Sequence, residues 1–157
     1  MIPVKRLREM LLELRSEVNS SSEVEKLIEH IIVSPTEKHL TNKLKDKSDL
    51  ILAVKMPDSD TDAINADNYG EVNHNLFYLV EKVDPGKMTD NDELNHFSAI
   101  QKTMTLVKEW LFKRGLNGNV CGGDETVSKP FRTEWEYQTF GGFNGLSISF
   151  DLKDFSL

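Results

Sequence analysis

The side chains that could do chemistry are few, and the most regular group of them is acidic. Asp58, Asp60 and Asp62 alternate with hydroxyl residues in the segment Asp-Ser-Asp-Thr-Asp. Alternating carboxylates can converge on one hard cation, as they do at the start of a calcium-binding loop. The sixth position of such a loop is Ala63 here and the twelfth is Tyr69, so the turn glycine and the bidentate glutamate are both missing. We therefore interpret the segment as a solvated acidic loop and expect no metal ion or cofactor. The alternative is a calcium-responsive interaction module.

The histidines and the single cysteine show no spacing typical of a metal or catalytic site. None of the four histidines lies at a metal-ligand spacing from another histidine or from Cys121. Cys121 stands beside two glycines without the signature of a cysteine nucleophile, and neither a phosphate-binding loop nor a serine nucleophile elbow occurs. The sequence therefore predicts a protein that is not an enzyme. The alternative is an enzyme or small-ligand protein in which segment 57–70 is a lid and the candidate groups are His74, Tyr78 and Asp62.

The composition predicts one soluble globular domain that spans residues 1–157. The chain is 38% hydrophobic and 29% charged, which is ordinary for such a domain. Its net charge of −7 repels a phosphate backbone, so we expect no specific nucleic-acid binding. No apolar run reaches the roughly 20 residues that a bilayer requires, so we expect no membrane association.

Among the elements that must position these groups, the clearest is residues 131–153. Apolar residues alternate with polar residues on each side of a glycine-rich interruption. They are the odd-numbered Phe131, Trp135 and Tyr137 before it, and the even-numbered Leu146, Ile148, Phe150 and Leu152 after it. This alternation predicts a β-hairpin with one buried face and one wet face. A turn at Gly141-Gly142 or at Asn144-Gly145 gives different registers, but both place Trp135 and Ile148 on the same face.

The wet parity of the hairpin supplies the candidates for a partner contact. Three charged residues, Arg132, Glu134 and Glu136, alternate along its first strand. Phe140 shares their parity, and an aromatic side chain exposed to water is a reasonable contact for another protein. We therefore predict a contact surface made of these four residues.

The first third of the chain, residues 1–47, is predicted to be helical. An apolar stripe from Val4 to Val18 indicates the first helix. Ser22 and Glu25 form a capping box before a second helix that Pro35 ends, and a third short helix is expected at Glu37–Leu44.

The middle of the chain is predicted to contain two strands and one long helix. The apolar runs 50–54 and 76–80 suit buried strands, and the acidic segment 57–70 between them is expected to be a long loop. A stripe from Phe97 to Leu111 indicates the main helix. Together the elements predict an α+β fold, a two-layer sandwich. It has a mostly antiparallel four-stranded sheet with two main helices on one face, in the order α-β-β-α-β-β.

This layout resembles the tail-completion (tail-terminator) and head-tail joining proteins of tailed bacteriophages. Three segments carry the resemblance, namely 31–37, 75–80 and 144–152. The resemblance implies a structural protein of a phage or phage-like particle that forms a homo-oligomeric ring, often hexameric. Such a ring caps the tail tube or joins it to the neck as a head-tail connector, with other virion proteins as partners. It also implies virion assembly in the bacterial host cytoplasm, a sheet that faces ring neighbours or the lumen, and a long loop that docks on the next virion component.

Overall fold

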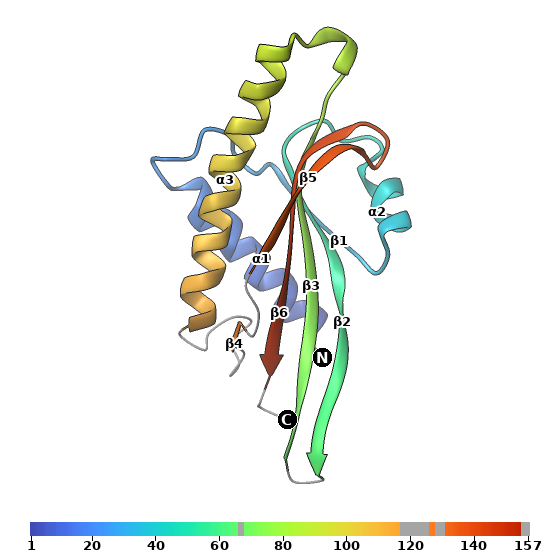
Figure 1. The fold of residues 1–157 in the computed structure, drawn as a ribbon, viewed down its shortest axis with the longest axis vertical. Coiled ribbons are helices and arrows are strands. Elements are labelled where there is room, and N and C mark those ends of the chain that lie inside the picture. Colours follow the sequence, from blue (N-terminus) through green and yellow to red (C-terminus); the bar gives the residue numbers. More distant parts are fainter. Residues whose placement is uncertain (66–67, 117–125, 128–130, 155–157) are drawn as a thin grey trace.

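The computed structural model describes residues 1–65, 68–116, 126–127 and 131–154 (Figure 1). Its elements in chain order are α1 (Val4–Asn19), β1 (His30–Ser34), α2 (Glu37–Leu44), β2 (Ile51–Asn65), β3 (Asn68–Lys82), the 3-10 turn η1 (Pro85–Lys87), α3 (Asp90–Leu116), β4 (Thr126–Val127), β5 (Arg132–Thr139) and β6 (Phe143–Asp154). Within the described ranges, no helix has the length and apolar composition needed to cross a membrane.

The strands form one mixed sheet, and the α+β class is confirmed. The strand order is β1-β2-β3-β6, and both β4 and β5 pair with the far side of β6. β1 runs parallel to β2, whereas the other pairings are antiparallel. The predicted four-stranded antiparallel sheet and the order α-β-β-α-β-β are therefore wrong in detail. The parallel edge strand β1 was missed, and the predicted order leaves out the short helix at 37–44.

One face of the sheet is covered by two helices, as predicted. α1 and α3 lie together over this face (Figure 1). Their buried stripes, which include Leu11 and Leu14 of α1 and Ile100 and Val107 of α3, pack on alternate residues of the central strands. Those strand residues are Leu52, Val54, Phe77, Leu79, Leu146, Ile148, Phe150 and Leu152. This face holds the larger of the two apolar clusters, so it supplies most of the hydrophobic stabilisation.

The opposite face of the sheet is covered at one end only. The short helix α2 lies on this face (Figure 1) and is capped by the Thr36 hydroxyl, which accepts from the His39 amide. Leu40 and Leu44 of α2 pack there in a second apolar cluster with Ile51, Ala53, Tyr78, Val80 and Phe143. The prediction of a helix at 37–44 is confirmed, but it covers the other face from α1 and α3.

Residues 20–34 do not form the predicted second helix. The described chain runs through turns after α1 and then enters β1, whose register pairs Ile31 with Leu52 and Val33 with Val54. The β-branched run of Ile31, Ile32 and Val33 favours a strand, and ladder pairing outweighs the weak local preference of a capping box. The helical assignment of residues 1–47 is correct only for α1 and α2.

Segment 57–70 is not the predicted loop. β2 and β3 continue through it as a two-stranded arm that extends beyond the rest of the sheet (Figure 1). A register shift between Lys55 and Asp58 marks an irregularity at the base of this arm. The residues of this segment are mostly polar and show no apolar alternation, so the pattern used to find strands could not detect it.

The C-terminal hairpin is confirmed, and its turn contains Gly141-Gly142, one of the two predicted turns, but its register and the burial of its first strand differ from expectation. The turn spans Phe140 to Gly142, and a register shift after Glu136 moves the partner of Leu146 to Trp135. Trp135 and Tyr137 are 58% and 59% exposed, because β5 lies at the sheet edge, where α3 covers it only in part. The buried face of the hairpin is therefore carried by β6.

Gly145 lies inside β6 and allows two strands to pack closely. A Cβ atom at this position would lie 2.0 Å from the Leu79 carbonyl oxygen, which is backbone and cannot move aside. The glycine at 145, predicted as a possible turn residue, instead permits the β3–β6 pairing.

We expect Gly145→Ala to destabilise the protein by about 3 kcal/mol or to prevent folding, because the methyl group overlaps the Leu79 backbone. Chemical denaturation of the variant measures the effect. Gly86→Ala is the matched control, since its Cβ would meet only a side-chain oxygen of Asp84 at 3.4 Å. Equal stability of the two variants would contradict the close approach.

The irregular segment before β1 is held by an ionic cluster under α3. Glu81 of β3 accepts hydrogen bonds from Lys26 and from Nε2 of the buried His96, the latter at 2.7 Å. Burial by itself raises the pKa of Glu81, but the hydrogen bonds from His96 and Lys26 outweigh it, and the net pKa is lowered. This cluster joins the 20–29 segment to both β3 and α3.

We expect Glu81→Gln to lower the free energy of unfolding by about 2 kcal/mol at neutral pH, because Lys26 and His96 lose their anion. Because the pKa of Glu81 is lower in the folded protein, its carboxylate stabilises the fold at pH values above 4.5, the pKa in the unfolded chain. This stabilisation is lost as the pH falls through the folded pKa. The difference in the free energy of unfolding between wild type and variant should therefore become smaller below about pH 4.5. Glu25→Gln, which breaks an exposed pair with Lys102, is the control and should have little effect.

Candidate interaction surface

The part of the sheet that α2 leaves uncovered is a polar surface, which we call the open face. Paired residues of neighbouring strands point to the same side of a sheet, so the register defines its members. They are Lys55, Asp58 and Asp60 of β2, His74 of β3, Ser147, Ser149 and Asp151 of β6, and Arg132, Glu134 and Glu136 of β5. Ser147 and Asp151 are themselves buried beneath the side chains of their neighbours. Three of the four predicted contact residues of the hairpin, all except Phe140, and two of the three predicted acidic residues therefore lie on one surface.

His74 is held between two carboxylates from two different neighbouring strands. Its Nδ1 lies 2.7 Å from Oδ1 of Asp151 on β6, and its Nε2 lies 3.0 Å from Oδ2 of Asp60 on β2. The hydrogen bonds to Asp151 and then to Asp60 raise the pKa of His74. A protonated ring donates to both acids, so this cluster is an ionic clasp at the base of the arm. Both ring nitrogens are occupied, which leaves neither to act as a base or a metal ligand in this arrangement.

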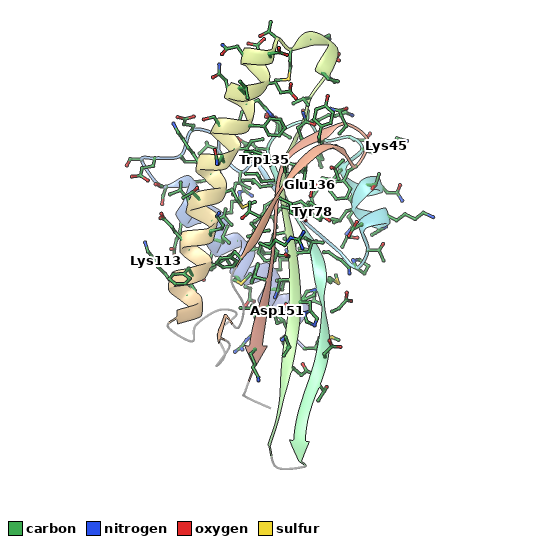
Figure 2. The ribbon with its side chains drawn as sticks, viewed as in Figure 1. Lys45, Tyr78, Lys113, Trp135, Glu136 and Asp151 are labelled. Carbon is green, nitrogen blue, oxygen red and sulfur yellow. The ribbon has the colours of Figure 1, made fainter. Side chains whose placement is uncertain are left out.

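Tyr78 lies nearer the α2 end of the same face and is buried. Figure 2 shows Tyr78 beside Glu136 and well separated from Asp151. Burial, followed by the charges of Glu37 and Glu136, raises the pKa of the Tyr78 phenol, so it stays protonated. Tyr78 and His74 are four residues apart on β3, which is about 13 Å. They therefore cannot act on the same reacting atoms.

The acidic residues of the arm have basic partners. Asp58 accepts from Lys55 at 2.7 Å, and this hydrogen bond lowers the pKa of Asp58. Asp60 contacts His74, while the side chain of Asp62 lies outside the described residues. Among the described residues no group of three or more His, Cys, Asp or Glu is placed to hold a metal ion. Cys121 also lies outside the described residues.

The lid alternative loses its structural basis. Segment 57–70 is a paired arm rather than a loop, and its base is fixed by the Asp60–His74–Asp151 clasp. Of the three groups named for that alternative, His74 and Tyr78 are held apart on one strand and Asp62 has no described side chain.

The hairpin residues divide into exposed and packed groups. Arg132 pairs with Glu134 at 2.6 Å, and both are exposed. Glu136 accepts hydrogen bonds from Ser147 at 2.7 Å and from Thr139 at 2.8 Å. The prediction that Phe140 is exposed is wrong, because its ring packs edge-on against Tyr78 at 4.9 Å beside α2. Phe140 therefore contributes to the smaller apolar cluster.

The exposed aromatic residues of β5 were missed by sequence reasoning. Trp135 and Tyr137 have the parity of the face that α1 and α3 cover, but they lie at its uncovered margin. Trp135 contacts only the rim of the helix layer, where its ring packs edge-on against Phe97 at 5.3 Å. The strand position at the sheet edge, rather than any sequence pattern, decides their exposure.

Comparison of the sequence with models of known protein families gave no match, and comparison with curated proteins gave none either. The surface must therefore be interpreted from its geometry.

We expect His74→Gln to destabilise the protein by about 1 kcal/mol near pH 6, equivalent to a fall in Tm of about 2–4 °C, because glutamine cannot carry the charge between the two acids. Because the pKa of His74 is higher in the folded protein, the protonated ring stabilises the fold fully at pH values below 6.5, the pKa in the unfolded chain. This stabilisation is lost as the pH rises through the folded pKa. Thermal unfolding measured from pH 6 to 9 should show that the difference in Tm between wild type and variant becomes smaller as the pH rises. His39→Gln, at an exposed position on α2, is the control, and a gap independent of pH would contradict the clasp.

Proposed function

We propose that this protein is a non-enzymatic assembly protein that forms a homo-oligomeric ring, as a tail terminator or neck adaptor of a phage or phage-like particle. One observation carries the proposal. Among the described residues, the outer edges of β1 at one end of the sheet and of β5 at the other pair with no further strand. An uncovered edge is a template for another chain, and β5 also exposes Trp135 and Tyr137 there.

The two edges are different surfaces, which favours a ring over a simple dimer. Contact between unlike surfaces of identical subunits is heterologous, and it closes into a ring when the rotation allows. A twofold dimer would instead use one edge twice. The resemblance to tail-completion proteins suggests six subunits, although the geometry described here does not depend on that number.

The open face and the arm fit roles in such a ring. Carboxylates outnumber basic groups on the open face, and a lumen lined in this way repels the DNA backbone and lets it slide. The β2–β3 arm extends beyond the sheet (Figure 1), and in this proposal it contacts the next virion component. In this proposal the protein acts in the virion after assembly in the bacterial host cytoplasm.

Light scattering coupled to size-exclusion chromatography, followed by negative-stain microscopy, tests the proposal. We expect a particle with a central opening and a mass that is a whole multiple of 17.9 kDa. Trp135→Ser should shift the population towards monomer and lower the Tm only slightly, because the ring of Trp135 is largely exposed in a single copy and contacts Phe97 edge-on. Phe112→Ser, at an exposed aromatic residue on α3, is the matched control and should leave the oligomer intact. A monomer at every concentration would contradict the proposal.

A further inference from the structure

The free edge of β1 forms the floor of a groove of about 650 Å³. α1 borders one side of the groove and α2 the other, because these helices lie on opposite faces of the sheet. β1 itself is only half-buried over residues 30–33. A strand edge between two walls has the width and hydrogen-bonding groups to take one more extended strand.

The walls of this groove are apolar near α1 and basic on both sides. Val4 and Leu12 of α1 are 53% and 46% exposed although they face the groove. The basic lining residues are Arg8, Arg15, Lys43 and Lys47, and the one acidic lining residue is Glu29. In a chain of net charge −7, this concentration of positive charge selects an acidic strand.

One basic side chain already uses a strand acceptor. Lys43 donates to the Val33 carbonyl oxygen at 2.7 Å, so a backbone oxygen near the end of β1 is satisfied by an exposed side chain rather than by a further strand. An incoming strand could replace this lysine and leave it free to pair with a carboxylate.

β5 has the chemistry that the groove selects. Its two faces differ, with Trp135 and Tyr137 exposed on the face of α1 and α3, and Glu134 and Glu136 on the face of α2. Arg132 is the one basic residue of the strand, and it pairs with Glu134 within a single copy. β5 therefore carries aromatic residues on one face and a net negative charge on the other.

We propose that the groove along β1 takes strand β5 of a second copy of this chain, which continues the sheet from one subunit to the next. The strand directions fit. From the pairings, β5 runs antiparallel to β1 within one copy. Rotation about an axis along the strands keeps that relation between copies, and an antiparallel ladder over the five residues of β1 results.

The faces fit as well. A rotation leaves the α1 and α3 face of every copy on the same side of the continued sheet. Trp135 and Tyr137 then meet Val4 and Leu12, and the guanidinium groups of Arg8 and Arg15 can lie over the aromatic rings. On the other side, Glu134 and Glu136 meet Lys43 and Lys47. A slip of one residue would exchange the faces and lose both matches, so the register is restricted.

Cysteine cross-linking between subunits tests the contact, which rests on the proposed ring. In a Cys121→Ser background, Ile32→Cys on β1 is combined in turn with Arg132→Cys, Glu134→Cys and Glu136→Cys, which share its face. Within one copy the two edges are four strand spacings apart, about 19 Å, which is too far for a disulfide. We expect one of the three pairs to give a ladder of linked chains on non-reducing gels after mild oxidation. Ile32→Cys with Thr133→Cys, on opposite faces, is the control and should not link.

Charge reversal provides a second measurement. Lys47→Glu and Glu134→Lys should each weaken assembly about tenfold, and the double variant should recover most of the loss. The oligomer mass as a function of concentration measures this. A wild-type ring without cross-linking at any of the three pairs, or without recovery in the double variant, would overturn the β5–β1 contact and leave the proposed function standing. A wild type that is monomeric throughout would overturn both, and the basic groove would then be assigned to an acidic strand of another protein.

Discussion

The pairing of β3 with β6, from Glu71 opposite Asp154 to Lys82 opposite Phe143, is the interaction on which the rest of the structure depends. It joins β6, which follows α3 in the sequence, to the β2–β3 hairpin, which precedes α3. Leu79 and Leu146, and Phe77 and Ile148, become cross-strand neighbours beneath α1 and α3. The close approach at Gly145 shows how little space separates the two strands. Without this pairing the helices would have no continuous apolar face to cover.

The same pairing creates the surfaces that could serve a function. It brings Asp151 to His74 and so forms the clasp at the base of the arm. It also places β5 on the outside of β6, so that the sheet ends in a strand whose aromatic residues only partly meet the helix layer. Because β1 occupies the opposite end, the molecule presents two unlike edges. An unpaired strand edge is either protected from pairing or used to bind another chain. The exposed aromatic side chains of β5 favour binding.

Sequence reasoning succeeded where local pattern and tertiary burial agree. The stripes of α1 and α3 and the apolar alternation of β6 each have one face in the main core, so their periodicity is visible. It failed where the pattern was absent or overridden. The arm is mostly polar in sequence, and in residues 30–34 the pairing with β2 outweighs the helical pattern that a capping box suggested. The candidate residues on the hairpin were identified by type, but the packing of Phe140 under α2 could not be foreseen.

By itself, the sequence determined the apolar stripes of the helices, the buried parity of β6 and the two central strands. Burial on one face imposes periods of 3.6 or 2 residues locally, and burial on both faces imposes the continuous apolar runs of the central strands. It also determined the acidic character of the chain. Only the tertiary structure decided that α2 covers the opposite face, that His74 lies between Asp60 and Asp151, and that Trp135 is exposed. The physical reason is that these features depend on which strands become neighbours, and strand neighbours are chosen by contacts between residues far apart in the chain.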